Sequence, residues 1–394
     1  MSAPKDSPLY PDWDYVIITA SNARQARAYE SQIRLRGSLG LVRGAKKILV
    51  IADPGDRRVG SGGSTVHCLL RILDRELGAS RKSRARSDAG TWTEIFSGLR
   101  ILIVHAGGDS RRLPPYGPCG KIFVPVPGEA GGAAGTTLFD RLIPTYLRLP
   151  RPWSGRGQVV VGSGDVLLDF DTSAVVFAEK GVTGVGAFVA PDLAKNHGVY
   201  CREESGEVRL FLQKPSPAAQ VSFGAVNAQG QAVLDIGILN FAPEAAARLL
   251  ELCEVGRYGK AGRGLRWQGP IAEAIESVGL DVYREICCAL GRDARPQGYI
   301  DQVRGAGSGL GAGALRALYR GLRPLPFHVH VVPRFRFLHF GTLRDLLVSG
   351  RALVDSEMAE PAKEPGILVN SLIRGEGPSR ERTPGSKAAG SMRR

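Results

Sequence analysis

The feature that most constrains the fold is an alternation of short apolar runs with amphipathic stretches near the start of the chain. The runs at 14–19, 47–52 and 99–104 are rich in Val, Ile and Leu, as buried strands are. The stretches at 23–36 and 64–77 separate them, and the apolar residues of the second recur at a spacing near 3.6, as on one face of a helix. Strands that alternate with helices predict an α/β fold with a mostly parallel sheet covered on both faces.

The same alternation continues through the middle of the chain. Further strands are expected at 158–161, 175–178, 185–189, 208–212 and 232–239, and helices at 242–254, 271–278 and 281–289. The glycine-rich stretch at 305–313 is expected to form a flexible loop, and 326–332 and 335–340 to form β segments.

Composition excludes several classes of protein. The 394 residues are 43% hydrophobic and 23% charged, which is ordinary for a globular protein, and no apolar run reaches the eighteen residues of a membrane span. The N-terminus lacks the apolar core of a signal peptide, so we expect a cytoplasmic protein with no membrane partner. The six cysteines show no C-x-x-C spacing, which argues against a disulfide framework and against a zinc site.

The formal net charge of +14 is unusually high. It is compatible with acidic small substrates or with nucleic acid, but no recognisable nucleic-acid motif interleaves the charges with aromatic residues, so we expect no nucleic-acid partner. Part of the charge lies in 81–86 and in a tail, 374–394, that we expect to be disordered.

A glycine- and arginine-rich loop, AGGDSRRLPPYGPCGK, follows the third apolar run over 106–121. In a parallel sheet, ligands bind where loops leave the carboxyl ends of strands. Gly107 and Gly108 would let backbone N–H groups approach an anion, and Arg111, Arg112 and Lys121 could neutralise it. Residue composition alone leaves two alternatives, a phosphate-binding loop and an ordinary surface loop with solvated cations.

The text AGGDSRRLPPYGPCGKIFVPVP resembles the signature of the sugar-1-phosphate nucleotidylyltransferases. The wider family has glycine, threonine and proline where this chain has Ser110, Arg111 and Gly120. At these three positions the chain instead resembles the L-fucose-1-phosphate guanylyltransferase branch of the family. Other stretches resemble the same branch in the same order: 14–20, 60–65, 164–166, 196–200, 212–216, 235–239, 281–291 and 337–343.

The resemblance implies a doubly wound, Rossmann-like fold and a reaction between GTP and L-fucose 1-phosphate that needs Mg²⁺. It assigns Arg112, Lys121 and Lys214 to the phosphates as catalytic residues, and Asp165 to the metal. Asn196, His197, Gly198 and Asp235 would contact the sugar. The nucleotide would be bound by Gly60, Ser61, Gly62, Gly63, Gly107, Gly108, Ser110 and Arg111.

Other interpretations stay open for several of these residues. The stretch 60–65 could be a plain strand–helix turn, Asp165 an Asx-turn residue, and His197 a surface histidine. His328 and His330 alternate on one face of an expected strand, but no third metal ligand is evident. His339 is expected to have a structural role.

The expected organisation is an N-terminal extension (1–13), a nucleotidylyltransferase domain (14–345), the start of a truncated left-handed β-helix (346–373) and the tail. Longer relatives carry a kinase beyond that β-helix, and we expect none here. The alternatives are another sugar 1-phosphate, UTP in place of GTP, and a non-catalytic sugar-nucleotide-binding subunit. The sequence leaves the oligomeric state open.

Overall fold

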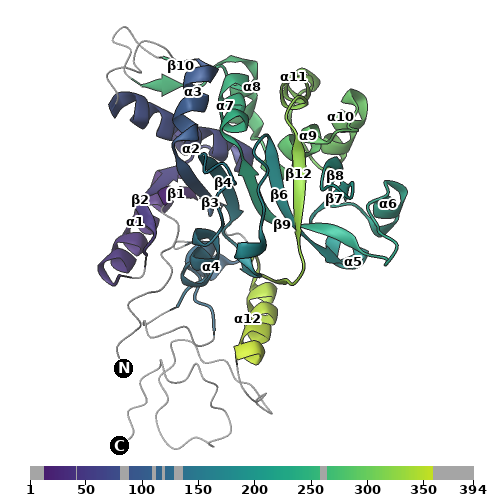
Figure 1. Cartoon of the computed structure of the whole chain (residues 1–394). Helices are drawn as coiled ribbons and strands as arrows, with labels where there is room; N and C mark the ends of the chain where they lie inside the picture. The colour runs from purple at the N-terminus through teal and green to yellow at the C-terminus, as the bar shows by residue number, and fades with distance from the viewer. Residues whose placement is uncertain are drawn as a thin grey trace, which may run out of the picture. The chain divides into compact units, whose positions relative to one another are not determined.

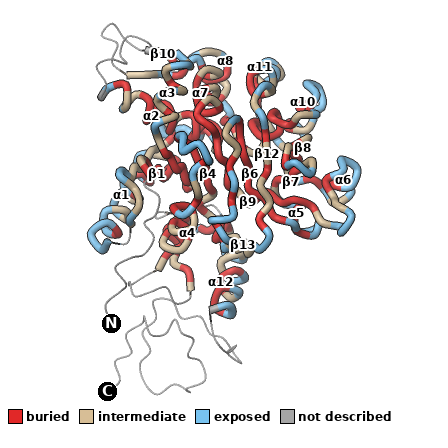
Figure 2. The backbone as a smooth tube through the Cα atoms, in the orientation of Figure 1, coloured by how far each residue is buried: buried red, intermediate tan, exposed pale blue. Residues whose placement is uncertain are grey.

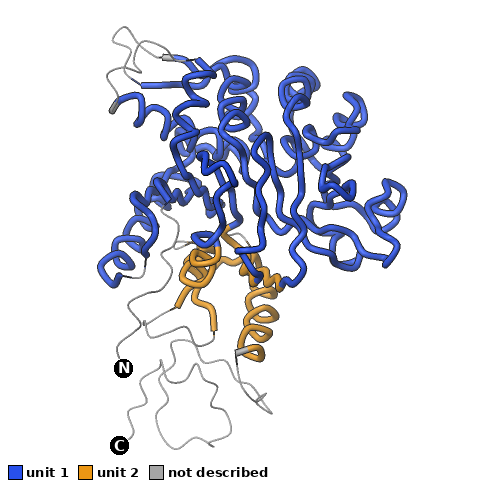
Figure 3. Tube along the Cα trace, viewed as in Figure 1, with its two compact units in different colours: residues 1–108, 146–163, 170–335 blue, residues 109–145, 164–169, 336–394 orange. Residues whose placement is uncertain are grey.

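The computed structural model describes residues 13–40, 42–79, 88–108, 112–117, 120–127, 136–257 and 264–357. These residues divide into two compact units (Figure 3). Unit 1 comprises 1–108, 146–163 and 170–335, and unit 2 comprises 109–145, 164–169 and 336–394. The expected domain at 14–345 is therefore built from interleaved segments of two units. The expected extension at 1–13 and tail at 374–394 lie outside the described residues, apart from Trp13.

Unit 1 is an α/β structure around one sheet (Figure 1). Its strands are β1 (Trp13–Ala20), β2 (Ala45–Ala52), β3 (Arg100–His105), β4 (Gln158–Ser163), β6 (Val182–Val189), β7 (Gly198–Arg202), β8 (Val208–Gln213), β9 (Ala232–Phe241) and β12 (Phe327–Val332), with a separate hairpin of β10 (Gly256–Arg257) and β11 (Leu265–Arg266). Its helices are α1 (Ala23–Ser38), α2 (Gly60–Ala79), α3 (Ala89–Ser97), α5 (Pro191–Ala194), α6 (Pro217–Ser222), α7 (Pro243–Leu252), α8 (Gly269–Val278), α9 (Cys288–Leu290), α10 (Pro296–Gly305) and α11 (Ala312–Leu322). Short turns are η1 (Pro54–Asp56), η4 (Thr172–Ala174) and the π-helical η5 (Val282–Cys287).

The strand order β12-β6-β9-β4-β3-β1-β2 confirms the mostly parallel sheet. Strand β1 pairs in parallel with β2 and β3, β3 with β4, and β6 with β12. Only β9 runs against its neighbours β4 and β6 along this path through the described strands. Because β2 and β3 lie on opposite sides of β1, the direction of winding reverses there. This is the topological switch point where open α/β sheets bind ligands.

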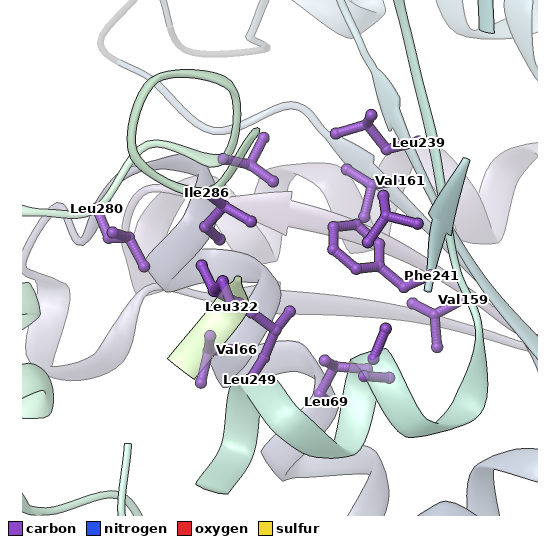
Figure 4. Packing of buried hydrophobic residues seen from close by; sticks show 14 of the residues in the cluster. Val66, Leu69, Val159, Val161, Leu239, Phe241, Leu249, Leu280, Ile286 and Leu322 are labelled. Atoms are coloured by element: carbon purple, nitrogen blue, oxygen red, sulfur yellow. The ribbon is translucent and has the colours of Figure 1, made fainter. Parts of the chain in front are cut away.

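The central strands are buried on both faces, as their near-continuous apolar sequence predicts (Figure 2). One face carries Ile17, Ile103 and Val161 into a large core that also contains residues of α2, α7, α8, α11 and η5. Figure 4 shows part of this core, in which Val66 and Leu69 of α2 pack with Leu249 of α7. The other face of β1 and β3 is also fully buried at Val16, Ile18 and Leu102.

Unit 2 is smaller and contains η2 (Pro114–Tyr116), η3 (Lys121–Phe123), most of α4 (Leu138–Leu147), β5 (Val166–Asp169), β13 (Arg336–His339) and α12 (Leu343–Glu357). Strands β5 and β13 form an antiparallel pair in which His339 lies opposite Val166. None of the helices in the described part of the chain has the length and apolar character that crossing a membrane demands.

Three local predictions differ from the structure. Residues 175–178 form no strand: Val175 and Phe177 are buried, but the segment follows η4 without joining a sheet. The stretch 60–65 is the start of α2 itself and not a turn before it. The expected β-helix at 346–373 is not confirmed, because 346–357 belong to α12, where Ser349, Leu353 and Val354 are buried at helical spacing. Residues 358–373 lie outside the described ranges.

Candidate active site

A polar pocket of about 100 Å³ lies at the switch point of unit 1. It is formed at the carboxyl ends of the three strands that meet there: Thr19 lies near the end of β1, Asp53 directly follows β2, and His105 ends β3. The remaining lining residues are Arg58, Gly60, Ser61, Ser64, Gly107 and Gly108. Its volume is well below the roughly 300–1,000 Å³ of pockets that enclose a drug-sized ligand, so it would hold only one part of such a ligand.

The structure brings both predicted glycine-rich stretches to this pocket. Gly107 follows β3, and its N–H donates to Thr19 Oγ1 (3.3 Å), which also accepts from the Ala106 N–H (3.1 Å). Gly108 has φ +136°, a value that favours glycine, and its carbonyl accepts from Gln25 Nε2 (3.1 Å). Ser110 and Arg111 of the same loop lie outside the described residues.

The glycines of α2 have a packing role at this end of the helix. The N–H groups of Gly62 and Gly63 donate to the Leu280 carbonyl oxygen (2.8 and 3.2 Å). A Cβ on Gly60 would lie 2.4 Å from that same oxygen. The absence of side chains at these glycines lets α2 approach the Leu280 backbone closely. This packing explains the glycines whether or not the first turn also binds a nucleotide.

Sequence reasoning missed two titratable residues that line the pocket, Asp53 and His105. Asp53 is only 8% exposed, and burial raises the pKa of its carboxyl group above the usual value. Its Oδ1 accepts from Ser64 Oγ at 2.5 Å. Burial lowers the pKa of His105 to about 4, so the ring is neutral near pH 7. The position of Asp53 after the second strand of a doubly wound sheet was the available sequence signal.

A second cluster in unit 1 contains the predicted sugar-contacting residues. Asp235 Oδ1 accepts from the Tyr200 hydroxyl and from the Gly237 N–H, both at 3.0 Å, and burial raises the pKa of this carboxyl to about 7. Gly198 is packed so closely that a Cβ would lie 3.1 Å from the Asp235 Cβ. The structure therefore brings Gly198 and Asp235 together.

Lys214 joins the same region through its backbone. Its N–H donates to the His197 carbonyl (2.9 Å), which places it beside the Asn196–His197 turn. Lys214 has φ +51°, a backbone conformation that residues other than glycine rarely adopt. Its side chain is exposed. Asn196 is exposed as well. Both side chains are therefore accessible to a ligand. The phosphate contact of Lys214 and the sugar contact of Asn196 remain predictions.

Unit 2 brings Lys121 and Asp165 together. Lys121 Nζ lies 3.4 Å from Asp165 Oδ2, and the two side chains are 20% and 28% exposed. The Asp165 carbonyl accepts from the Phe340 N–H (2.8 Å), which ties the turn before β5 to the end of β13. Arg112 is exposed, and its carbonyl accepts from the Leu343 N–H (3.1 Å) at the start of α12.

His339 also belongs to this cluster, although the sequence suggested only a structural role. Its Nε2 lies 3.6 Å from Asp165 Oδ2, and its Nδ1 lies 2.9 Å from Asp345 Oδ2. The nearby carboxylate of Asp165, together with that of Asp345, raises the pKa of His339. Gly341 leaves the space that this ring needs, because a Cβ there would lie 2.3 Å from it.

The donor set around Asp165 fits Mg²⁺ better than a soft metal. Magnesium is commonly held by one or two carboxylates together with substrate phosphate oxygens, and Asp165 is one partly exposed carboxylate. Among the described residues, no group of three His, Cys, Asp or Glu side chains could hold a metal ion, and His328 and His330 gain no third ligand.

These observations define an open α/β protein with a polar switch-point pocket in one unit and a lysine–carboxylate cluster in the other. Residues 93–361 match the family model of the fucose pyrophosphorylase domain, which is more than half of the chain. The chain belongs to that family.

Curated relatives include two bifunctional proteins. The chain is 29% identical over 260 residues to the bifunctional fucokinase/GDP-fucose pyrophosphorylase of Arabidopsis thaliana, a match that covers 61% of this chain and 24% of the relative. It is 32% identical over 192 residues to the L-fucokinase/L-fucose-1-P guanylyltransferase of Bacteroides fragilis, covering 48% and 19%.

A third relative is the fucose-1-phosphate guanylyltransferase of Mus musculus, with 25% identity over 381 residues. That match covers 85% of this chain and 56% of the relative. The chain thus spans less than two thirds of the length of each of these relatives.

Proposed function

We propose that the chain transfers the guanylyl group of GTP to L-fucose 1-phosphate, giving GDP-L-fucose and pyrophosphate. The observation that carries this proposal is membership of the fucose pyrophosphorylase domain family over 93–361. The names of the relatives support the same reaction. The close approach of Lys121 to Asp165 supports it too, because a reaction between two phosphates needs both a cation and a carboxylate that can hold a metal.

The proposed step forms one P–O bond and breaks one. An oxygen of the sugar phosphate attacks the α-phosphorus of GTP, and the bond from that phosphorus to the oxygen bridging the α- and β-phosphates breaks to release pyrophosphate. The second pKa of a phosphate monoester is about 6, so the attacking phosphate is already largely dianionic at pH 7. The reaction therefore needs no side-chain base, and the protein's contribution is to orient two anions and neutralise them.

Each predicted residue has a distinct part in this proposal. Lys121 would stabilise negative charge on the α-phosphate, Arg112 would bind the β- and γ-phosphates, and Lys214 the phosphate of the sugar. Asp165 would hold Mg²⁺, which supplies positive charge to the phosphate oxygens when bound.

The test is a matrix of nucleoside triphosphates against sugar 1-phosphates with the full chain and Mg²⁺, measuring pyrophosphate release. We expect the highest kcat/KM for GTP with L-fucose 1-phosphate. A preference for UTP or for glucose 1-phosphate of about tenfold, equivalent to about 1.4 kcal/mol, would contradict the assignment. Binding of GDP-fucose without turnover of any pair would instead favour a non-catalytic sugar-nucleotide-binding subunit.

A further inference from the structure

The switch-point pocket of unit 1 holds a buried carboxylate, Asp53, and two serine hydroxyls whose protons are already donated to carboxylates. Ser64 donates to Asp53, and Ser61 Oγ donates to Asp281 Oδ2 (3.0 Å) while it accepts from the Val282 N–H (2.9 Å). The Asp53 carboxylate has about four lone-pair sites. It accepts from Ser64 and from the Val59 backbone and so keeps the capacity to accept further hydrogen bonds.

His105, which also lines the pocket, has a buried acceptor atom in its ring. The single hydroxyl proton of Thr65 is donated to the Ser61 carbonyl (2.9 Å), so Thr65 Oγ1 accepts from His105 Nε2, which lies 2.9 Å away. With the proton on Nε2, Nδ1 of the neutral ring is an acceptor, and this buried atom has no hydrogen-bond partner among the described residues.

A buried carboxylate in the pocket favours some parts of a nucleotide over others. A phosphate group would meet the negative charge of Asp53 at close range. A ligand edge with neighbouring N–H donors matches it. Guanine is the common base with two adjacent donors, N1–H and the N2 amino group. Adenine has an unprotonated N1 beside its amino group, and uracil has a single N3–H between two carbonyls.

We propose that Asp53 accepts hydrogen bonds from N1–H and the N2 amino group of guanine and so determines the base specificity of this pocket. The inference rests on the proposed function, because it takes the ligand to be a guanine nucleotide. The carboxylate is suitably held: the Asp53 N–H donates to the Ala20 carbonyl (2.8 Å) at the end of β1, and Ser64 orients Oδ1. Arg58 also lines the pocket, and its positive charge near Asp53 favours the ionised form of that carboxyl group.

The test compares equilibrium binding of GTP, ITP and 2′-deoxy-GTP, without sugar phosphate, to the wild type and to Asp53→Asn. ITP lacks only the N2 amino group. A hydrogen bond to a charged acceptor corresponds to roughly a ten- to hundredfold change in affinity, so we expect the wild type to bind ITP that much more weakly than GTP. Asp53→Asn keeps the side chain's shape and an oxygen for Ser64 but replaces one acceptor by a donor. We expect the GTP/ITP ratio to fall to within about threefold.

Asp56→Asn is the matched control, because it removes the same charge three residues away. Asp56 accepts from the Ala23 N–H (2.7 Å), is absent from the pocket lining, and has φ +55°, which asparagine tolerates. This variant should keep the wild-type GTP/ITP ratio.

Three results would overturn the proposal: a wild type that binds GTP and ITP equally, an Asp53→Asn variant with an unchanged GTP/ITP ratio, or a variant that loses discrimination against 2′-deoxy-GTP instead. The last would place the ribose at Asp53. The wild-type comparison remains decisive even if the variant does not fold. Because binding is measured without sugar phosphate, a missing reaction with fucose 1-phosphate would refute the proposed function and leave this inference standing.

Discussion

At the scale of single residues, the side chains around Asp165 come from distant parts of the sequence. Lys121 lies 44 residues before Asp165, and His339 lies far beyond both, yet all three side chains converge. Their charges alternate in the order Asp345, His339, Asp165 and Lys121 when the imidazole is protonated. Because a positive charge lies between the two carboxylates, the electrostatic cost of holding them near one another is lower.

Replacing Lys121 by Ala should lower kcat more than it raises KM. If Lys121 stabilises charge mainly in the transition state, the loss in kcat is about a hundred- to a thousandfold, roughly 3–4 kcal/mol.

Asp165→Asn keeps the side chain's shape but removes its charge, so it should chiefly raise the Mg²⁺ concentration needed for half-maximal rate. Steady-state kinetics over a Mg²⁺ titration measure both effects.

Lys195→Ala is the control for lysine removal, because Lys195 is exposed and pairs with the exposed Asp192 in unit 1 (3.2 Å). It should leave kcat unchanged. Thermal melts should place all three variants near the wild type. Near-wild-type turnover in Lys121→Ala or Asp165→Asn would remove that residue from the mechanism, and activity that falls only in step with stability would indicate a structural role.

At the scale of secondary-structure elements, the start of α2 depends on close packing against the backbone around Leu280. Gly60 has φ +75°, and the Leu280 carbonyl accepts two N–H groups of the first turn. The glycines are therefore explained by backbone geometry, even though their spacing resembles a phosphate-binding loop. Both roles share one requirement, the absence of a Cβ.

Gly60→Ala should destabilise the protein by about 2–4 kcal/mol. The left-handed backbone conformation costs roughly 1–2 kcal/mol for a side chain, and the new Cβ would also clash with the Leu280 carbonyl. Gly78→Ala, near the other end of the same helix, places its Cβ in open space and should be neutral or stabilising by up to about 1 kcal/mol. Chemical denaturation of the two variants is the measurement, and equal stabilities would contradict the packing argument.

At the scale of the whole molecule, the formal net charge of +14 suits the anionic substrates that we propose. A positive protein raises the local concentration of GTP and of a sugar phosphate, and salt screens this attraction over a Debye length that falls from about 10 Å at 0.1 M to about 3 Å at 1 M. The net charge affects how anionic ligands associate with the protein, but it does not determine the fold.

Raising the ionic strength from about 0.05 M to about 0.5 M should therefore weaken GTP binding severalfold. Uncharged guanosine should be affected little, because it lacks the phosphates on which the long-range attraction acts. Titration calorimetry with both ligands in one salt series checks this. A parallel loss of affinity for GTP and guanosine would show that salt acts on the protein and not on charge attraction.

The fold class and most strands of the sheet could be predicted from the sequence, because strands buried on both faces need continuous apolar runs and amphipathic helices need a 3.6-residue period. The sequence also marked Lys121, Asp165, Gly107 and Asp235, whose residue types and order resemble a known family. It failed at 175–178, where burial occurs without strand pairing, and at 346–357, where an apolar segment is helical.

Only the tertiary structure decided which of the marked residues meet, and it added Asp53, His105 and His339. Their local signals are weak, since an aspartate after a strand or a histidine in an apolar run is compatible with many environments. Their chemistry is set by neighbours distant in sequence, such as Thr65 for His105 and Asp345 for His339. The division into interleaved units has the same origin, because it depends on contacts that close over long loops and leave no periodicity in the sequence.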